Sequence, residues 1–247
     1  GEVELATIED SGNLGIALRE LAGALRSSPI CAVGWIGFDV TRGITADVRV
    51  RRALSLAIDR RVITDKVRGL GEQPSDALLP PGLPDCPQPQ LPDYADWPMP
   101  KRIAAARELL RQAGVAAGSG PPLALGYAVS PTMRKVYLAI ASMWNAIGVR
   151  SELQPLDGRA YNVALQKRQF QAFSYATFAQ VLTASVFLDR FRADSPINFC
   201  GWQSPEFDRA FAAAERQPTI ALRTASYAPA ERILLRELPV LPLYGGV

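Results

Sequence analysis

The sequence predicts an α/β fold, with a mixed β-sheet flanked by helices, because helical and extended patterns alternate along the chain. Apolar residues recur at helical spacing, for example in residues 13–26, where four leucines share one face. Short apolar runs, such as 31–40 and 172–178, are typical of buried strands. Nine prolines in residues 72–100 exclude a regular helix or a central strand there, so we expect a long surface loop.

The other expected elements follow from periodicity and from capping residues. Asp47 can cap a helix over residues 47–59, and Ser204-Pro205 is a typical helix start. The further expected helices cover residues 61–67, 101–113, 132–147, 158–168, 205–215 and 219–237. The further expected strands cover residues 123–129, 149–156 and 240–244.

Composition narrows the possible functions. The chain has 247 residues, of which 48% are apolar, enough for one sizeable core or two small ones. A net charge of +3 favours neither a nucleic acid nor an acidic membrane as partner. No apolar run approaches the roughly 20 residues of a membrane-spanning helix. The first residues are acidic, unlike the basic start of a signal peptide, so we expect any export leader to lie outside this chain.

The chain contains no histidine, which excludes Ser-His-Asp and Cys-His catalysis and every histidine-ligated metal site. Cys31, Cys86 and Cys200 form no CxxC pair, so a metal-binding knuckle is not expected. One disulfide with a free third thiol, or three buried thiols, are both compatible with the sequence.

Two charged clusters could hold ions. The first contains five arginines, which we interpret as a solvated helix face in preference to a phosphate site: Arg49, Arg51, Arg52, Arg60 and Arg61. The second contains Asp189, Asp194 and Asp208, whose spacing matches no calcium loop. We therefore expect no metal and no cofactor.

Four sequence blocks, taken in order, resemble one known family. They are RVRRALSLAIDR at 49–60, LPPG at 79–82, AARELLRQAG at 105–114, and SPEFD at 204–208 followed by AERIL at 230–234 and PVLPLY at 239–244. The set is similar to the oligopeptide/dipeptide/nickel-binding family of extracytoplasmic solute-binding proteins, which serve ABC importers. The resemblance runs from about residue 30 to residue 244.

The resemblance implies a fold and a set of partners. It implies a type II periplasmic-binding-protein lobe, the second of two lobes that close on a solute. Residues 1–28 would be a segment from the first lobe or hinge, and residues 29–247 the second lobe, including the proline-rich loop 72–100. The implied partners are a peptide or other small solute, a membrane permease and the first lobe of the same protein, with no nucleic acid. The implied location is the periplasm, and the implied role is binding without catalysis.

The segment 172–188 resembles the family's strand and loop that end in the ligand cleft. Peptide-binding members carry an aspartate there for the ammonium of the peptide, usually with a tryptophan or glycine before it. Our alignment places Gln180 at the aspartate and Thr177 near the tryptophan. Glutamine cannot neutralise an ammonium, so a solute offering hydroxyls, amides or a carboxylate would suit it better.

The candidate ligand-binding residues are therefore Tyr175, Thr177, Phe178, Gln180 and Trp202. Each also has a plain structural interpretation. Tyr175, Phe178 and Trp202 could serve in packing, and Gln180 could be a solvated loop residue.

Two other function classes remain possible from the sequence. A transcription regulator can carry a ligand-sensing domain of this kind, which an N-terminal winged helix in the gene would reveal. A carboxylate-dependent hydrolase would need two convergent carboxylates, and the sequence shows no such pair.

Overall fold

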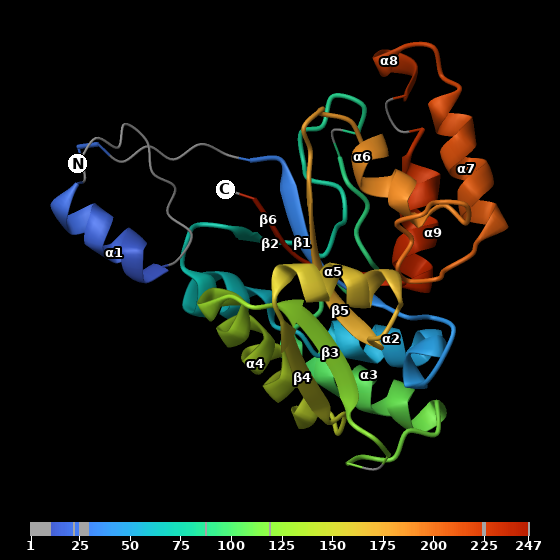
Figure 1. Cartoon of the computed structure of the whole chain (residues 1–247). Coiled ribbons are helices and arrows are strands. Elements are labelled where there is room, and N and C mark those ends of the chain that lie inside the picture. Colours follow the sequence, from blue (N-terminus) through green and yellow to red (C-terminus); the bar gives the residue numbers. More distant parts are fainter. Residues whose placement is uncertain are drawn as a thin grey trace.

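A computed structural model describes residues 11–21, 23–24, 30–86, 88–118, 120–223 and 226–246. Its centre is a six-stranded mixed sheet in the order β2-β6-β1-β5-β3-β4 (Figure 1). The strands are β1 Ala32–Phe38, β2 Gln73–Pro74, β3 Leu123–Ala128, β4 Ser151–Leu156, β5 Ala172–Phe178 and β6 Val240–Gly245. The predicted α/β class is confirmed.

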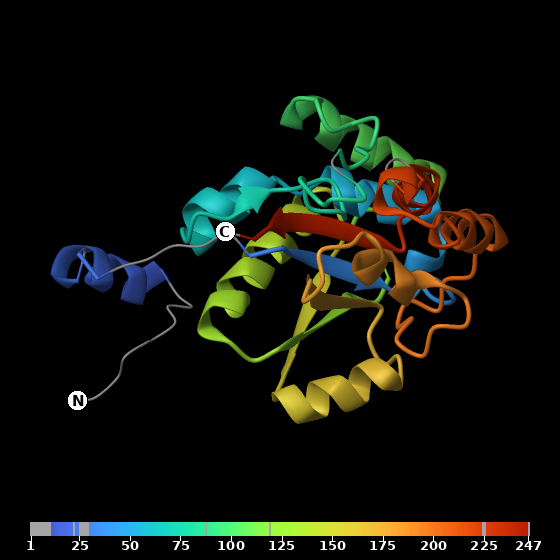
Figure 2. The same cartoon turned by 90° about the horizontal axis from the view of Figure 1, so that it is seen from above.

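Helices lie on both sides of this sheet, and α3 and α5 occupy opposite sides when the molecule is seen from above (Figure 2). The α-helices are α1 Ser11–Glu20, α2 Val48–Leu56, α3 Met99–Gln112, α4 Pro131–Ala146, α5 Gly158–Gln166, α6 Ser185–Leu188, α7 Pro205–Glu215, α8 Ile220–Arg223 and α9 Ala228–Glu237. Shorter turns are η1 Ile44–Ala46, the π-helical η2 Val62–Arg68 and η3 Asp189–Phe191.

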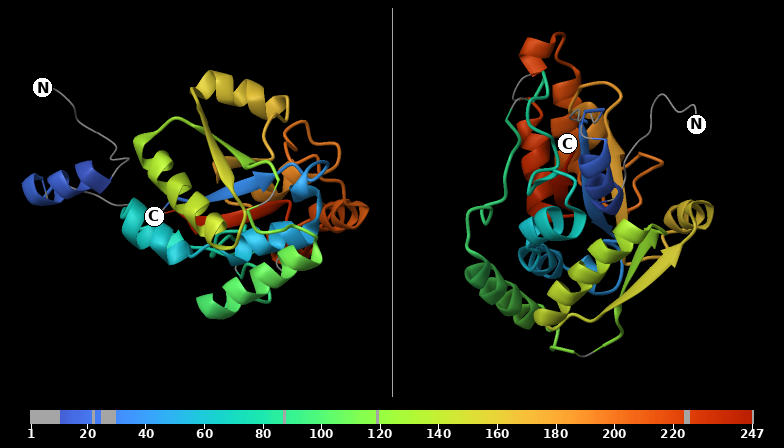
Figure 3. Two further views of the ribbon diagram at one scale, coloured as in Figure 1. Left: turned by 90° about the horizontal axis from the view of Figure 1, so that it is seen from below. Right: turned by 90° about the vertical axis from the view of Figure 1, so that its left-hand side faces the viewer.

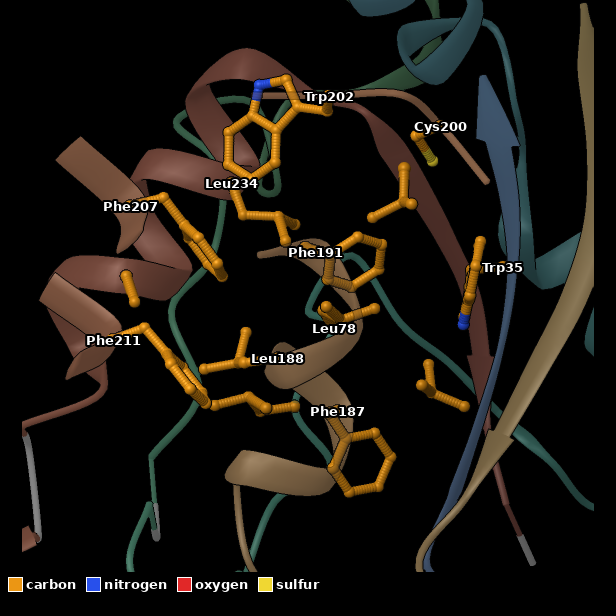
Figure 4. Close-up of a cluster of buried hydrophobic side chains, with 14 of the residues drawn as sticks. Trp35, Leu78, Phe187, Leu188, Phe191, Cys200, Trp202, Phe207, Phe211 and Leu234 are labelled. Carbon is orange, nitrogen blue, oxygen red and sulfur yellow. The ribbon is translucent and has the colours of Figure 1, made fainter. Parts of the chain in front are cut away.

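The strand β1 organises the sheet. All seven of its residues are buried, and it pairs antiparallel with β5 on one side and with β6 on the other. β3 runs parallel to both β4 and β5. The two faces of the sheet therefore each carry a hydrophobic core. One core packs against α2, α3 and α4, and the other against α5, α6, α7 and α9 (Figure 4).

Predicted helix starts are confirmed where a capping residue marks them. The Asp47 side chain accepts from the backbone N–H of Arg49, and the Ser204 side chain accepts from that of Phe207. The single helix expected over 219–237 is wrong, because the structure has α8 and α9 there. Pro229 lies in the first turn of α9, where its missing N–H needs no partner.

The interpretation of the five arginines as one solvated face is wrong for two of them. Arg51 is 5% exposed and Arg60 is 4% exposed. Arg51 donates to the carbonyl oxygens of Glu237 and Leu238, which belong to the distant end of α9. Arg60 forms a 2.8 Å ion pair with Asp76. These acceptors come from segments far away in sequence, so helical periodicity could not reveal them.

All three cysteines are free thiols. Cys86 and Cys200 are buried, and burial raises the pKa of each thiol to about 12. They therefore stay protonated and pack as small apolar groups near neutral pH.

Among the described residues, none of the helices combines the length and the apolar character that a bilayer span requires. Most of the segment assigned above to the first lobe or hinge, residues 1–28, coincides with α1 or falls outside the described part of the chain. The domain boundary at residue 28 stays a prediction.

The proline-rich segment runs along the side of the molecule, and its described residues form no helix before α3 begins at Met99 (Figure 3). Its short strand β2 lies at the edge of the sheet, where proline is tolerated. Glu231 on α9 binds the segment through two hydrogen bonds. One carboxylate oxygen accepts from the N–H of Leu79 at 3.1 Å, and the other accepts from the N–H of Gln90 at 2.7 Å.

Glu231 is 0% exposed, and burial raises the pKa of its carboxyl group from 4.5 to about 7. The backbone N–H groups oppose this rise, because they favour the ionised form, but burial dominates. The folded state therefore binds more protons than the unfolded state between about pH 4.5 and 7.

We expect the Glu231 contribution to stability to be complete below about pH 4.5 and to be lost as the pH rises through 7, by up to about 3 kcal/mol. Urea unfolding of the wild type and of Glu231→Gln, compared from pH 5 to 8, measures this. The variant places an amide N–H₂ opposite a backbone N–H and lacks the titration. The stability advantage of the wild type should therefore shrink as the pH rises. An advantage that is constant with pH would contradict the prediction.

Candidate functional site

The strand β5 has one unpaired edge. It pairs with β1 over its whole length, but with β3 only at Ala172 and Phe173. Its second half extends past β3 at the end of the sheet where β1 begins and β6 ends (Figure 1). An unpaired edge presents a row of backbone donors and acceptors to whatever lies beside it.

The hydrogen-bond pattern identifies the free groups. The N–H of Ala179 donates to the carbonyl of Cys31 at 2.8 Å, so alternate residues before it also face β1. The backbone groups of Ala176 and Phe178 consequently point away from β1. Within the described part of the chain, neither residue has a strand partner on that side. Two donors and two acceptors are therefore available to an added strand.

One face of this edge is small and apolar. Gly34 lies between Ala176 of β5 and Tyr244 of β6. A side chain at Gly34 would start 2.6 Å from the ring of Tyr244, so glycine is needed for the tyrosine to lie over β1. Phe178, opposite Ala32, is 62% exposed. Gly34, Ala176, Phe178 and Tyr244 share this face of the sheet, which we call the floor.

Charged groups border this floor. The guanidinium of Arg68 lies 4.5 Å from the ring centroid of Tyr244 and pairs with the carboxylate of Glu72. Arg68 also approaches the sulfur of Met133, at the start of α4. Motif reasoning missed Tyr244, although it ends the block PVLPLY. It also missed Arg68, which carries no motif signal.

The opposite face of β5 is aromatic. Tyr175 stacks on Trp35 with ring centroids 5.0 Å apart, and the guanidinium of Arg190 lies 4.4 Å from the Tyr175 centroid. Thr177 is buried, and its hydroxyl accepts from the indole N–H of Trp35 at 3.1 Å. Thr177 thus fixes the tryptophan beneath the edge, and Tyr175 is half-buried beside it.

The loop 179–184 follows the unpaired edge and exposes Gln180, Val181 and Leu182. Asp85, from the proline-rich segment, holds its far end. The Asp85 carboxylate accepts from the hydroxyl of Thr183, and from the N–H of Ala184 at 2.9 Å. Asp85 is itself buried, so the proline-rich segment determines where the loop lies.

Trp202 lies elsewhere. Its indole N–H donates to Glu237 at 2.8 Å, and its ring packs edge-on against Phe207 at 5.0 Å. It is buried among residues of α7 and α9 (Figure 4). The structure thus brings Tyr175, Thr177, Phe178 and Gln180 together on one strand and its loop, and it places Trp202 in the core.

A groove of about 960 Å³ lies on the other side of the loop, between the proline-rich segment and the ends of β1 and β6. Leu182 lines it. The buried charged side chains in its wall are Arg60 and Arg102, and both pair with the partly buried Asp76. We therefore place the candidate site at the β5 edge, where polar groups are free. No group of three or more acidic or cysteine side chains in the described residues could hold a metal ion.

Replacing Asp85 tests its hold on the loop. In Asp85→Ala the buried N–H of Ala184 loses its acceptor, which should cost about 1–3 kcal/mol in unfolding free energy. Amide hydrogen exchange should accelerate across residues 179–184. The control is Asp93→Ala in the same segment, because Asp93 is exposed and pairs only with Arg52 among the described residues. It should change stability by less than about 0.5 kcal/mol. Unchanged exchange in Asp85→Ala would refute the role assigned to Asp85.

Comparison with known proteins identifies the family. Residues 3–199 match the model of bacterial extracellular solute-binding proteins, family 5 Middle. The chain is 30% identical over 231 residues to the periplasmic murein peptide-binding protein MppA of Escherichia coli, covering 92% of this chain and 42% of the relative. It is 30% identical over 206 residues to the periplasmic oligopeptide-binding protein OppA of Haemophilus influenzae, covering 81% of this chain and 38% of the relative.

Solved structures agree with the predicted type II lobe. The fold superposes on OppA of Burkholderia pseudomallei with a TM-score of 0.90 at 28% identity, covering 96% of this chain and 47% of that one. It superposes on Haemophilus influenzae OppA in complex with RPPGFSPFR with a TM-score of 0.89 at 25% identity, covering 95% and 46%. The chain thus spans less than half the length of these relatives. It belongs to the family 5 bacterial extracellular solute-binding proteins.

Proposed function

We propose that this chain is one lobe of a periplasmic protein that captures a peptide or peptide-like solute for an ABC importer. The first lobe, from the rest of the same protein, would supply the other half of the site. A permease in the membrane would receive the solute. On this proposal the protein is not an enzyme, requires no cofactor and has no nucleic-acid partner.

The unpaired edge of β5 carries the proposal. An extended peptide can add to such an edge as a further strand, using main-chain hydrogen bonds that every peptide offers. Affinity then depends little on sequence, and the groups on either face of the edge select the side chains. The relatives named above are described as peptide-binding proteins, which is consistent with this mode.

The apolar surface at the candidate site is exposed, as expected if a second lobe supplies the other half of the binding site. Phe178, Val181 and Leu182 expose apolar surface next to the free backbone groups. Closure of a second lobe would bury this surface and remove water from the hydrogen bonds. The lobe by itself would gain too little burial to offset the entropy lost on binding, so we expect no measurable solute affinity from it alone.

Gln180 marks the difference from peptide binders that pair an aspartate with the N-terminal ammonium of a peptide. It is exposed in the loop after the free edge, where a solute's end would lie. Its amide offers hydrogen bonds but no negative charge. We therefore propose a solute whose end at Gln180 is not a free ammonium.

Identification of a co-purified solute tests the proposed function. The full-length protein, purified without denaturation, should release a small molecule that mass spectrometry identifies as a peptide or an amide-rich compound. The end of this molecule that would lie at Gln180 should be blocked or uncharged. Recovery of a nucleic acid, or covalent turnover of the bound molecule, would contradict the proposal.

Gln180→Asp should convert the site to ammonium recognition. We expect the full-length variant to bind a free-amine tripeptide about tenfold more tightly than the wild type, because a charged hydrogen bond contributes roughly 1.5–3 kcal/mol. Affinity for the N-acetylated form of the same peptide should not rise. Gln203→Asp adds the same charge at an exposed site outside the loop and is the control. Isothermal titration measures all three proteins, and equal affinities in wild type and Gln180→Asp would disprove the alignment.

A further inference from the structure

Arg190 is a buried cation that has no anionic partner among the described residues. It is 9% exposed, and its Nε and Nη1 atoms are buried without a hydrogen-bond acceptor. It forms no ion pair with any described carboxylate, and its neighbour Asp189 pairs with Arg192. Its described contacts are with two aromatic rings, at 4.4 Å from the centroid of Tyr175 and 5.5 Å from that of Trp35. Cation–π contacts offset part of the desolvation of a guanidinium, but they leave its N–H groups unsatisfied.

The position of Arg190 relates it to the unpaired edge of β5. Tyr175 and Thr177 project from one face of the strand, and Ala176 and Phe178 project from the other. A solute strand lying beside Ala176 and Phe178 would send alternate side chains to each face. Side chains on one face would reach the floor beside Tyr244. Those on the other face would reach Tyr175 and the guanidinium that stacks on it.

We infer that Arg190 recognises a carboxylate of the solute, and therefore that this protein prefers acidic peptides or peptide-like acids. A guanidinium carries a permanent positive charge, and its N–H groups donate charge-assisted hydrogen bonds to a carboxylate that are stronger than those between neutral groups. Tyr175 and Trp35 hold the plane of the guanidinium, so little side-chain freedom is lost when the acid binds. On this inference the acid would approach the guanidinium at Nη2, which is not among its buried unpartnered atoms.

The inference deepens the proposed function and rests on it. It also agrees with Gln180, since neither group calls for a positively charged solute. The carboxylate could belong to an acidic side chain or to the C-terminus of a peptide. Both offer the same chemistry to Arg190, and the experiment separates them.

The experiment is a competition for the full-length protein. Alanine tri- to pentapeptides, each with a single glutamate, are mixed in equal amounts with the matched glutamine peptides, and every peptide is also present with an amidated C-terminus. Mass spectrometry counts the peptides retained after buffer exchange. The proteins are the wild type, Arg190→Met and the control Arg209→Met, which removes an exposed arginine from α7. Thermal unfolding of each protein without peptide is recorded in parallel.

The wild type should retain acid-bearing peptides at least tenfold over matched peptides without that acid, and Arg209→Met should do the same. Loss of the preference on glutamate-to-glutamine exchange assigns the acid to a side chain, and loss on amidation assigns it to the C-terminus. Arg190→Met should abolish the preference. Its thermal midpoint should be equal to or above that of the wild type, because an unpaired buried charge has been replaced by an apolar group.

Two results would overturn the inference while leaving peptide capture intact. One is equal retention of acidic and neutral peptides by the wild type. The other is an unchanged preference in Arg190→Met, and a lowered thermal midpoint there would then show that Arg190 serves only in packing. Retention of no peptide by any of the proteins would instead refute the proposed function itself.

Discussion

The buried carboxyl groups of Glu231 and Asp85 fix the position of the proline-rich segment and of the loop after β5. Proline has no N–H, and the proline-rich segment accordingly contributes a strand of two residues, β2, at the edge of the sheet. Glu231 on α9 accepts hydrogen bonds from two backbone N–H groups of this segment, at Leu79 and at Gln90. Two points of the segment, eleven residues apart, are thus attached to α9. Asp85, in the same segment, accepts hydrogen bonds from Thr183 and Ala184 and so attaches the loop after β5 to the segment. The candidate site is thereby positioned by a segment that contributes no regular secondary structure to it.

Much of this fold could be predicted from periodicity and capping, since those signals are local. Asp47 and Ser204 marked helix starts correctly because a capping side chain acts within three residues of itself. Arg51 and Arg60 were misplaced because their acceptors are carbonyl groups of α9 and β6, which helical spacing cannot anticipate. The break between α8 and α9 was missed, although Pro229 was the available signal.

The candidate site was only partly predictable for the same reason. The strand 172–178 was predicted from its apolar run, and the family resemblance then assigned the strand and its loop to the ligand cleft. Tyr175, Thr177, Phe178 and Gln180 therefore lie together in the structure. Which edge of that strand stays free is set by how far β3 extends beside it, and no residue of β5 encodes this. Arg190 gave no sequence signal, because its significance lies in having no hydrogen-bond acceptor for two of its nitrogens within the described part of the fold.

The unpaired edge of β5, which on the proposed function would receive a peptide, is also a hazard to the protein. Natural sheets protect exposed edges with charges, prolines or bulges, and the free part of β5 has small and apolar residues instead. Exposed apolar surface lies beside it, on Phe178, Val181 and Leu182. A second copy of the same lobe could use this edge as a solute would. The first lobe and the solute would therefore cover this edge and prevent self-association. The solubility of the protein would then depend on the fraction of time that the cleft is closed.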